Sequence, residues 1–166
     1  MTILDRVWGI ITRSDLHKAP VRMWIFCLIS LAEMHTVRII RSRYPHEGWK
    51  KHLLDARLKR AQRLFNMRKA SNEEIDLIDC LQLCDKANIL CESGDLLDLA
   101  FESKDKAQLF FGEVEQLRNR LVHAQDIITN SWSKLADLAI GLENFLKACE
   151  SLHSPTGSKR HCLEQT

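Results

Sequence analysis

The sequence has little glycine and little proline, with 6 Gly and 3 Pro among 166 residues. Disordered and fibrous chains are typically rich in these residues or poor in apolar ones, whereas apolar residues make up 45% of this chain. The composition therefore excludes both classes. It favours one helical globular domain that is long enough to bury a sizeable core.

The chain also lacks a long hydrophobic run. Its longest apolar stretch, Met23 to Ala32, is followed directly by Glu33. This stretch is shorter than the roughly 20 residues that are needed to span a bilayer. The first residues show no basic segment followed by an apolar core, which a secretory signal would have. We therefore expect a soluble, cytoplasmic protein without membrane contact.

Cys-x-x-Cys pairs, which zinc sites usually need, are absent among the six cysteines. Cys80, Cys84 and Cys91 recur at helical spacing beside leucines and are expected to act as small apolar core residues. Free thiols of this kind are typical of the reducing cytosol. Neither a metal nor a cofactor is expected.

A net charge of +2 hides two segments of opposite charge. Between Thr36 and Ala70, 11 basic residues face two acidic ones, a net of +9; between Ser71 and Glu115, 12 acidic residues face three lysines, a net of −9. One interpretation is that these segments attract each other within the bundle or across a dimer. The other is that the second predicted helix presents a surface that attracts phosphates.

Apolar periodicity predicts an all-α fold, an antiparallel bundle of about five helices. The expected helices cover about residues 21–43, 48–69, 71–91, 103–128 and 131–152. Residues 1–19 form a short extended arm with a strand near 6–12, residues 20–153 form the bundle, and the polar tail 154–166 is expected to be disordered.

Capping residues indicate where two of these helices begin, and apolar residues indicate their core faces. Ser71 and Glu74 match the S-x-x-E capping box, and Ser103 can cap the fourth helix. The core positions expected on the first helix are Ile25, Leu28, Ile29, Ala32, Thr36 and Ile39, and those on the second are Leu54, Leu58, Ala61 and Phe65.

The predicted fourth helix divides into a core stripe and a polar sector. The stripe consists of Phe110, Val114, Leu117, Leu121, Ala124 and Ile128. Arg118, Asn119, His123 and Asp126 fall in the opposite sector, which spans roughly 140°. This sector combines a permanent cation, an amide, an imidazole and a carboxylate on one helix surface.

The pattern Arg118-Asn119-x-x-x-His123 resembles the R-N-x-x-x-H motif of the HEPN family. The motif lies on a late long helix of an all-α bundle, as it does in that family. The resemblance extends to Leu28-x4-Glu33-Met34 and to residues 72–79, and covers about residues 21–152. It implies a homodimer in which the motif helices face each other across a cleft. Many members of the family cleave RNA without a metal.

The residue types fit that chemistry. An imidazole can remove the proton of the RNA 2′-OH or protonate the leaving oxygen, which assigns His123 as acid or base. Arg118 would hold the phosphate, and Asn119 would position Arg118 or the RNA. Asp126 would orient the ring of His123. Glu33 is a further candidate, because an acidic residue within an apolar helix needs a partner, either in the reaction or in a salt bridge to an arginine.

A second interpretation is a non-catalytic HEPN-type dimerisation or regulatory module, since fold-level resemblance does not guarantee activity. Toxin members of the family often carry a tyrosine two residues after the histidine, where this chain has Gln125. Regulation through such a tyrosine is therefore not available at that position. Any antitoxin or regulatory partner is left open.

The segment Gly9 to Leu16 resembles the closing G-h-h-T-x-x-D-h element of a CBS motif. In CBS domains the residues matching Thr12 and Asp15 contact the ribose of an adenine nucleotide. A CBS pair is far longer than the segment before Pro20, so this element is either a remnant or an accidental strand-and-cap sequence. In neither case do we expect it to bind a nucleotide alone.

Overall fold

The computed structural model describes residues 2–3, 6–7, 12, 15, 18–92, 100–127 and 132–153. Its elements are β1 (Thr2–Ile3), β2 (Arg6–Val7), α1 (Ala19–Arg43), the 3-10 segment η2 (Pro45–His52), α2 (Asp55–Ala70), the 3-10 turn η3 (Leu77–Cys80), α3 (Leu83–Cys91), α5 (Lys104–Val122) and α6 (Trp132–His153). Apart from the short β1–β2 pairing these elements are helical, which confirms the predicted all-α class.

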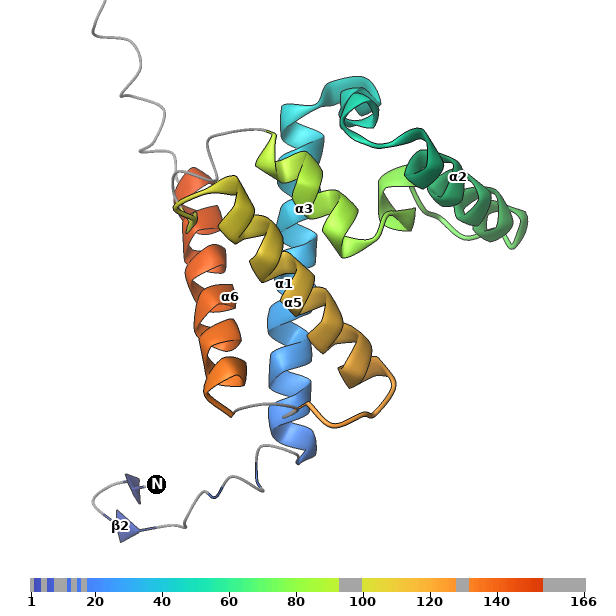
Figure 1. Ribbon diagram of the computed structural model, residues 1–166. Coiled ribbons are helices and arrows are strands. Elements are labelled where there is room, and N and C mark those ends of the chain that lie inside the picture. The colour runs from blue at the N-terminus through green and yellow to red at the C-terminus, as the bar shows by residue number, and fades with distance from the viewer. Residues whose placement is uncertain are drawn as a thin grey trace, which may run out of the picture.

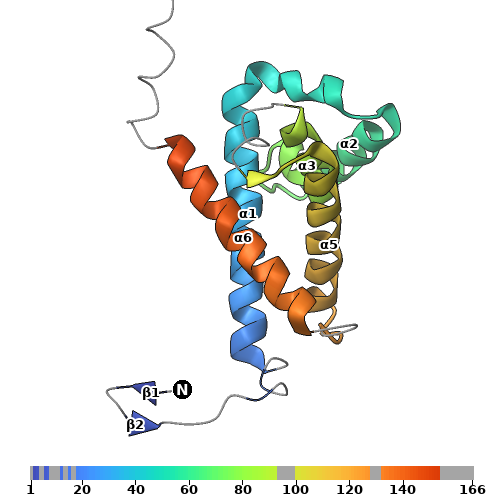
Figure 2. The ribbon, with the colours of Figure 1, turned by 60° about the vertical axis from the view of Figure 1, so that its left-hand side comes forward.

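The central helix of the bundle is α1. It contacts α3, α5 and α6, and α5 also contacts α3 and α6. Figures 1 and 2 show that α5 runs antiparallel to both α1 and α6. Phe111 of α5 and Phe145 of α6 meet edge to face in the main core, with ring centroids 5.3 Å apart. This aromatic contact joins the two helices that flank α1.

A second, smaller core lies beneath α2. It contains Ile40 of α1, Trp49 of η2, Ala61 of α2 and Ile78 of η3. Along this core α2 contacts η3, and Figure 1 shows that α2 projects to the side of the main bundle. Most side chains of α2 are therefore exposed to solvent.

The first and last predicted helices are confirmed by α1 and α6. All six expected core positions of α1 are buried. By length and composition α1 could also cross a membrane, with a mean hydropathy of 1.5. A core helix of a soluble protein has the same properties, and the fold is compatible with a soluble protein.

The core stripe of the predicted fourth helix is confirmed in part. Val114 and Leu117 of α5 are buried, and Phe110 and Leu121 pack partly buried against the main core. Ser103 caps α5 as predicted, because its hydroxyl accepts the backbone N–H of Lys106 at 3.3 Å. Placing Ala124 in the core is wrong, since this residue is exposed beyond the helix end, and Ile128 lies outside the described residues.

The prediction of one helix over residues 48–69 is wrong. The chain forms η2 up to His52, is extended at Leu53 and Leu54, and enters α2 only at Asp55. Trp49 is 3% exposed and Leu53 packs against the second core, and the bend between the two segments lets both side chains reach it. Leu54, expected in a core stripe, is 76% exposed.

The predicted third helix begins too early. Ser71 ends α2 as its C-cap, and Asn72 adopts a left-handed φ of 59°. The capping contact lies further along, where the backbone N–H of Asp76 donates to the Asp79 carboxylate at 2.9 Å. Residues 71–91 therefore contain a turn, the short η3 and then α3, instead of one long helix.

The N-terminal arm contains an antiparallel pairing of β1 with β2. Residues 8–11 of the predicted strand, most of the CBS-like element, and the tail 154–166 lie outside the described residues. The backbone N–H and the hydroxyl of Thr12 donate to the Asp15 carboxylate at 2.6 and 2.9 Å. Lys18 and these bonds from Thr12 lower the pKa of Asp15 to about 2. In this structure Thr12 and Asp15 thus bond to each other in a local turn before α1.

Candidate functional site

The candidate site lies at the C-terminal end of α5, which ends earlier than predicted. Val122 is its last residue, and Ala124 has a left-handed φ of 52°. The backbone N–H of Gln125 donates to the carbonyl of Arg120 at 2.9 Å, and that of Ala124 donates to the carbonyl of Leu121 at 3.3 Å. This pair of bonds is a Schellman motif, which usually has glycine at the left-handed position. The helix end is hard to recognise in the sequence because alanine occupies that position.

Arg22, near the start of α1, closes the same helix end. Its guanidinium donates to the carbonyls of Gln125, Leu121 and Arg120 at 2.8, 3.2 and 3.4 Å. The carbonyls of Arg120 and Leu121 belong to the last turn of α5 and also accept the Schellman bonds, whereas that of Gln125 lies just beyond the helix end. A cation at a helix C-terminus also interacts favourably with the helix dipole. Arg22 thereby fixes the segment that contains His123. No local sequence pattern points to this contact, because about a hundred residues separate its partners along the chain.

Asn119, His123 and Asp126 do not all lie on one helix face as predicted, because α5 ends before Asp126. Asn119 is exposed on the last turn of α5, and the other two residues are exposed beyond its end. The His123 backbone N–H donates to the carbonyl of Asn119 at 3.1 Å. Within the described part of the chain, the His123 ring has no hydrogen bond or ion pair, and none joins it to Arg118. The imidazole is therefore open to a substrate or to a second molecule.

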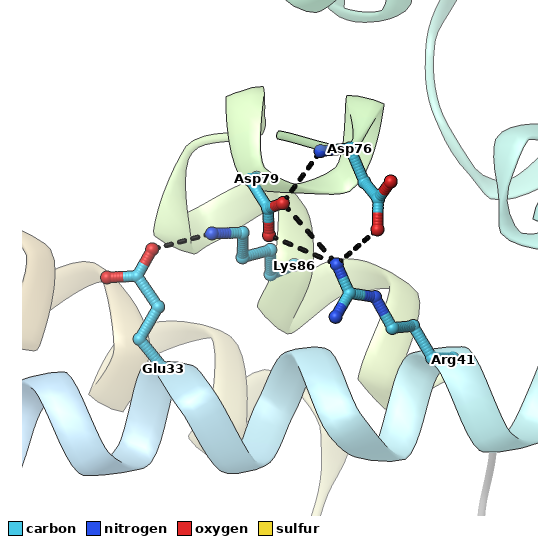
Figure 3. Close-up of polar contacts among 5 residues, drawn as sticks. All are labelled: Glu33, Arg41, Asp76, Asp79 and Lys86. Carbon is cyan, nitrogen blue, oxygen red and sulfur yellow. Dashed lines mark hydrogen bonds and ion pairs between the residues drawn. The ribbon is translucent and has the colours of Figure 1, made fainter. Parts of the chain in front are cut away.

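Arg118 and Glu33 are predicted site residues that the structure brings together. Arg118 Nε lies 3.7 Å from Glu33 Oε2, and Lys86 Nζ donates to Glu33 Oε1 at 2.6 Å (Figure 3 shows Glu33 with Lys86). The exposed fractions of the Arg118, Glu33 and Lys86 side chains are 40%, 22% and 3%. This chain of charges therefore leads from the surface into the bundle.

The ion pair leaves Arg118 available to other partners. A separation of 3.7 Å is too long for a hydrogen bond. The Arg118 guanidinium forms no hydrogen bond among the residues that the structure describes. Its fork of N–H donors matches the geometry of a phosphate. The predicted alternative for Glu33, a salt bridge to an arginine, is thus present, and it does not prevent Arg118 from binding an anion.

Lys86 is the site component that the sequence does not reveal. It lies in α3 within the acidic segment, where a lysine is expected to be a solvated surface residue. Its burial is possible because Glu33 supplies a counter-charge, and a buried charge without one is costly. Glu33 therefore holds two cations from different helices, one exposed and one buried.

A polar pocket of about 440 Å³ lies beside these residues, between α1 and the η3–α3 segment. It is lined by Glu33, Met34, Val37, Arg38, Arg41, Asp79 and Lys86. Figure 3 shows Arg41 held by two acids, since its Nη2 donates to Asp76 at 2.7 Å and contacts Asp79 at 3.4 Å. Arg38 is exposed in the pocket and forms no ion pair within the described residues.

The structure contains ion pairs between the basic and the acidic segment, and it also contains exposed cations on α2. Arg41, Arg57 and Arg68 of the basic segment form ion pairs with acids of the acidic segment. The outer face of α2, opposite its buried side, carries Lys59, Arg60 and Arg63. These three exposed cations form no ion pair within the described part of the chain.

The described cysteines differ in their exposure. Cys80 and Cys91 are buried, as predicted, and Cys84 is partly buried. Burial raises the pKa of Cys84 to about 11, so this thiol stays protonated near neutral pH. Among the described residues, no group of three or more His, Cys, Asp or Glu side chains is arranged to hold a metal ion.

Comparisons of the chain with models of protein families, with curated proteins and with solved structures give no match.

Proposed function

We propose that this protein is a metal-independent endoribonuclease that cleaves RNA by 2′-OH transesterification at a site completed by a second copy of the chain. The observation that carries the proposal is the open end of α5. There Arg118, Asn119 and His123 lie within six residues of each other along the chain, and among the described residues neither the guanidinium nor the imidazole forms a hydrogen bond. These groups suit a reaction that needs proton transfer and stabilisation of a phosphate.

The reaction balances without a metal or a water molecule. The 2′-oxygen forms a bond to phosphorus as a base removes the 2′-OH proton, and the bond from phosphorus to the 5′-oxygen breaks as an acid protonates that oxygen. The products are a 2′,3′-cyclic phosphate and a free 5′-OH. We assign the proton transfers to His123. We assign the stabilisation of the charge on phosphate to Arg118.

The other residues have supporting roles in this proposal. Asn119 positions the phosphate or Arg118, and Glu33 orients Arg118 through their ion pair. Asp126 would orient the imidazole of His123, or that of the second copy. Because no hydrogen bond joins His123 to Arg118 among the described residues, a site that uses both residues needs RNA to bridge them or a partner subunit to supply one of them.

RNA would follow the basic surfaces of the molecule. The outer face of α2 offers three exposed cations and Arg38 offers a fourth in the polar pocket, and none of the four forms an ion pair with another described residue. Binding of this kind weakens as salt rises, because each phosphate contact releases counterions. The proposal places the protein in the reducing cytoplasm, where RNA and free thiols both occur.

The test is incubation of the purified protein with single-stranded RNA in EDTA. We expect wild type to cleave the RNA to 2′,3′-cyclic phosphate ends and to leave DNA of the same sequence intact. His123→Ala and Arg118→Ala should each lower the rate at least about 100-fold, as expected when a general acid–base or a charge-stabilising group is lost. Gln116→Ala, an exposed change on the same helix, is the control. If wild type and His123→Ala leave RNA equally intact, the proposal fails.

The second candidate function is a non-catalytic dimerisation or regulatory module, responsive to nucleotide when joined to complete CBS domains. The observation that favours it is the Arg118–Glu33–Lys86 chain, because a structural role accounts for all three charges. It predicts that RNA stays intact and that Arg118→Ala lowers stability without changing the oligomeric state. Thermal unfolding and light scattering of that variant, run beside the RNA assay, separate the two candidates.

A further inference from the structure

From Met23 to Met34 the exposed side of α1 is apolar. The open face of α1 consists of Met23, Trp24, Phe26, Cys27, Leu31 and Met34, all of which are exposed. Met23 is 67% and Met34 66% exposed. No charged residue lies between Arg22 and Glu33. A surface helix of a soluble protein normally has polar side chains on its outer side, so this face is unusual.

The apolar surface continues onto α6. A groove of about 240 Å³ between the two helices is lined mostly by apolar side chains, among them Trp24, Trp132 and Ile140. Trp132 is 46% and Ile140 55% exposed. Together with the open face these residues expose on the order of 700 Å² of side-chain surface, close to the roughly 800 Å² per partner that a standard interface covers. The area is thus large enough for a stable dimer.

We propose that the open face of α1 is a self-association surface on which a second copy of this chain binds, open face against open face, about a two-fold axis. In such an interface each copy buries the same patch, so the patch must be complementary to itself. An uncharged row of methionine, aromatic and leucine side chains meets this condition, because it brings no like charges together. Methionine side chains also adapt to an imperfect fit.

The open face adjoins the candidate site. Met34 belongs to the face and also lines the polar pocket, and it directly follows Glu33 in the sequence. A second copy on this face therefore borders the pocket, which Glu33 also lines. The self-association stands on the apolar surface alone, whereas the idea that the partner completes a catalytic site rests on the proposed ribonuclease function.

The test measures the oligomeric state by sedimentation equilibrium. We expect wild type to be a dimer, and Met23→Lys and Met34→Lys each to weaken association at least about tenfold, because each buries a charge in the interface. Met67→Lys is the matched control, since Met67 lies on α2 and is 68% exposed. Far-UV circular dichroism should show the same helix content in all four proteins.

The outcomes separate this inference from the proposed function. The self-association is overturned if wild type is monomeric at high micromolar concentration, or if Met34→Lys dimerises as well as Met67→Lys. It is also overturned if the protein stays monomeric and binds phospholipid vesicles through the open face. Loss of the dimer in Met34→Lys supports it even when no RNA is cleaved by any variant, a result that would reject only the ribonuclease. A monomeric Met34→Lys that cleaves at the wild-type rate would support the surface and reject the shared site.

Discussion

At the residue scale, the ammonium of Lys86 depends on one carboxylate. Lys86 is 3% exposed, and its Nζ lies 2.6 Å from Glu33 Oε1. We expect Glu33→Ala to lower the free energy of unfolding by about 3 kcal/mol, because it leaves a buried cation without an anion. Urea unfolding followed by circular dichroism measures this loss.

The double variant Glu33→Ala/Lys86→Met is the control for that prediction. It removes both charges while a flexible apolar side chain fills the space of the lysine, so most of the lost stability should return. If the double variant is as unstable as Glu33→Ala, then Lys86 does not depend on Glu33. The same pair of variants separates a role of Glu33 in RNA cleavage from its role in folding.

The buried thiols predict a pH dependence. Burial raises the pKa of Cys149 to about 12 and that of Cys84 to about 11, from 9.0. The folded protein therefore holds these protons more tightly than the unfolded chain does. The resulting stability is fully present below about pH 9 and is lost as the pH rises towards 11 and 12. We expect the urea midpoint to fall between about pH 8 and 10.5, and to fall less in Cys149→Ala. Parallel curves for the two proteins would contradict the assignment.

Sequence reasoning at this scale finds residue types better than their contacts. Glu33 could be identified as needing a partner, because it interrupts an apolar helix. Lys86 and Arg22 could not, because their partners lie 53 and about 100 residues away along the chain and no local period connects them. Apolar periodicity predicts which side of a helix a residue occupies, but not which residues distant in the sequence it contacts.

At the scale of the element, the end of α5 is held in a strained conformation. Ala124 has φ 52°, a region that is costly for a residue with a Cβ atom and free of that cost for glycine. We expect Ala124→Gly to raise the free energy of unfolding by about 1 kcal/mol, measured by urea unfolding. Gln125→Gly is the control, because Gln125 is not in the left-handed region and should gain nothing. Equal effects of the two changes would rule out strain at Ala124.

Arg22 holds the same helix end from outside. We expect Arg22→Met to cost about 1 kcal/mol of stability, because it removes three hydrogen bonds to the end of α5, while the carbonyls of Arg120 and Leu121 keep their Schellman bonds. If His123 is catalytic, RNA cleavage should fall more than RNA affinity, since the loop is displaced while the basic surfaces remain. Lys147→Met, an exposed change on α6, should alter neither quantity. An Arg22→Met protein with wild-type stability would show that the contact is not needed.

Helix centres were easier to predict than helix ends. The apolar rows of α1 and α6 place both helices, whereas the ends depend on side chains that several residues can supply. The sequence predicts Ser71 as an N-cap, whereas it is a C-cap, because serine suits both positions. The candidate site lies at such an end, and for this reason the sequence locates Arg118 but extends the helix face to Asp126, which lies beyond the end of α5.

At the scale of the whole molecule, the helix contacts of the bundle and the open face lie on opposite sides of α1. One side of α1 packs against α3, α5 and α6, and the opposite side is the open face. The composition predicts a single core, whereas the structure divides its apolar residues between the main core and the smaller one beneath α2. That division lets α2 project with its cations exposed, an arrangement that net charge alone does not show.

Cys27 lies within the open face and can report on whether a second copy covers it. Its thiol is exposed in the single chain. If open faces pair, the rate of Cys27 alkylation by iodoacetamide should fall as the protein concentration rises through the dissociation constant, because only the monomer exposes the thiol. In Met34→Lys the rate should stay fast at every concentration. Peptide mass spectrometry distinguishes this thiol from Cys84. A wild-type rate that is independent of concentration and equal to that of Met34→Lys would show that no second copy covers α1.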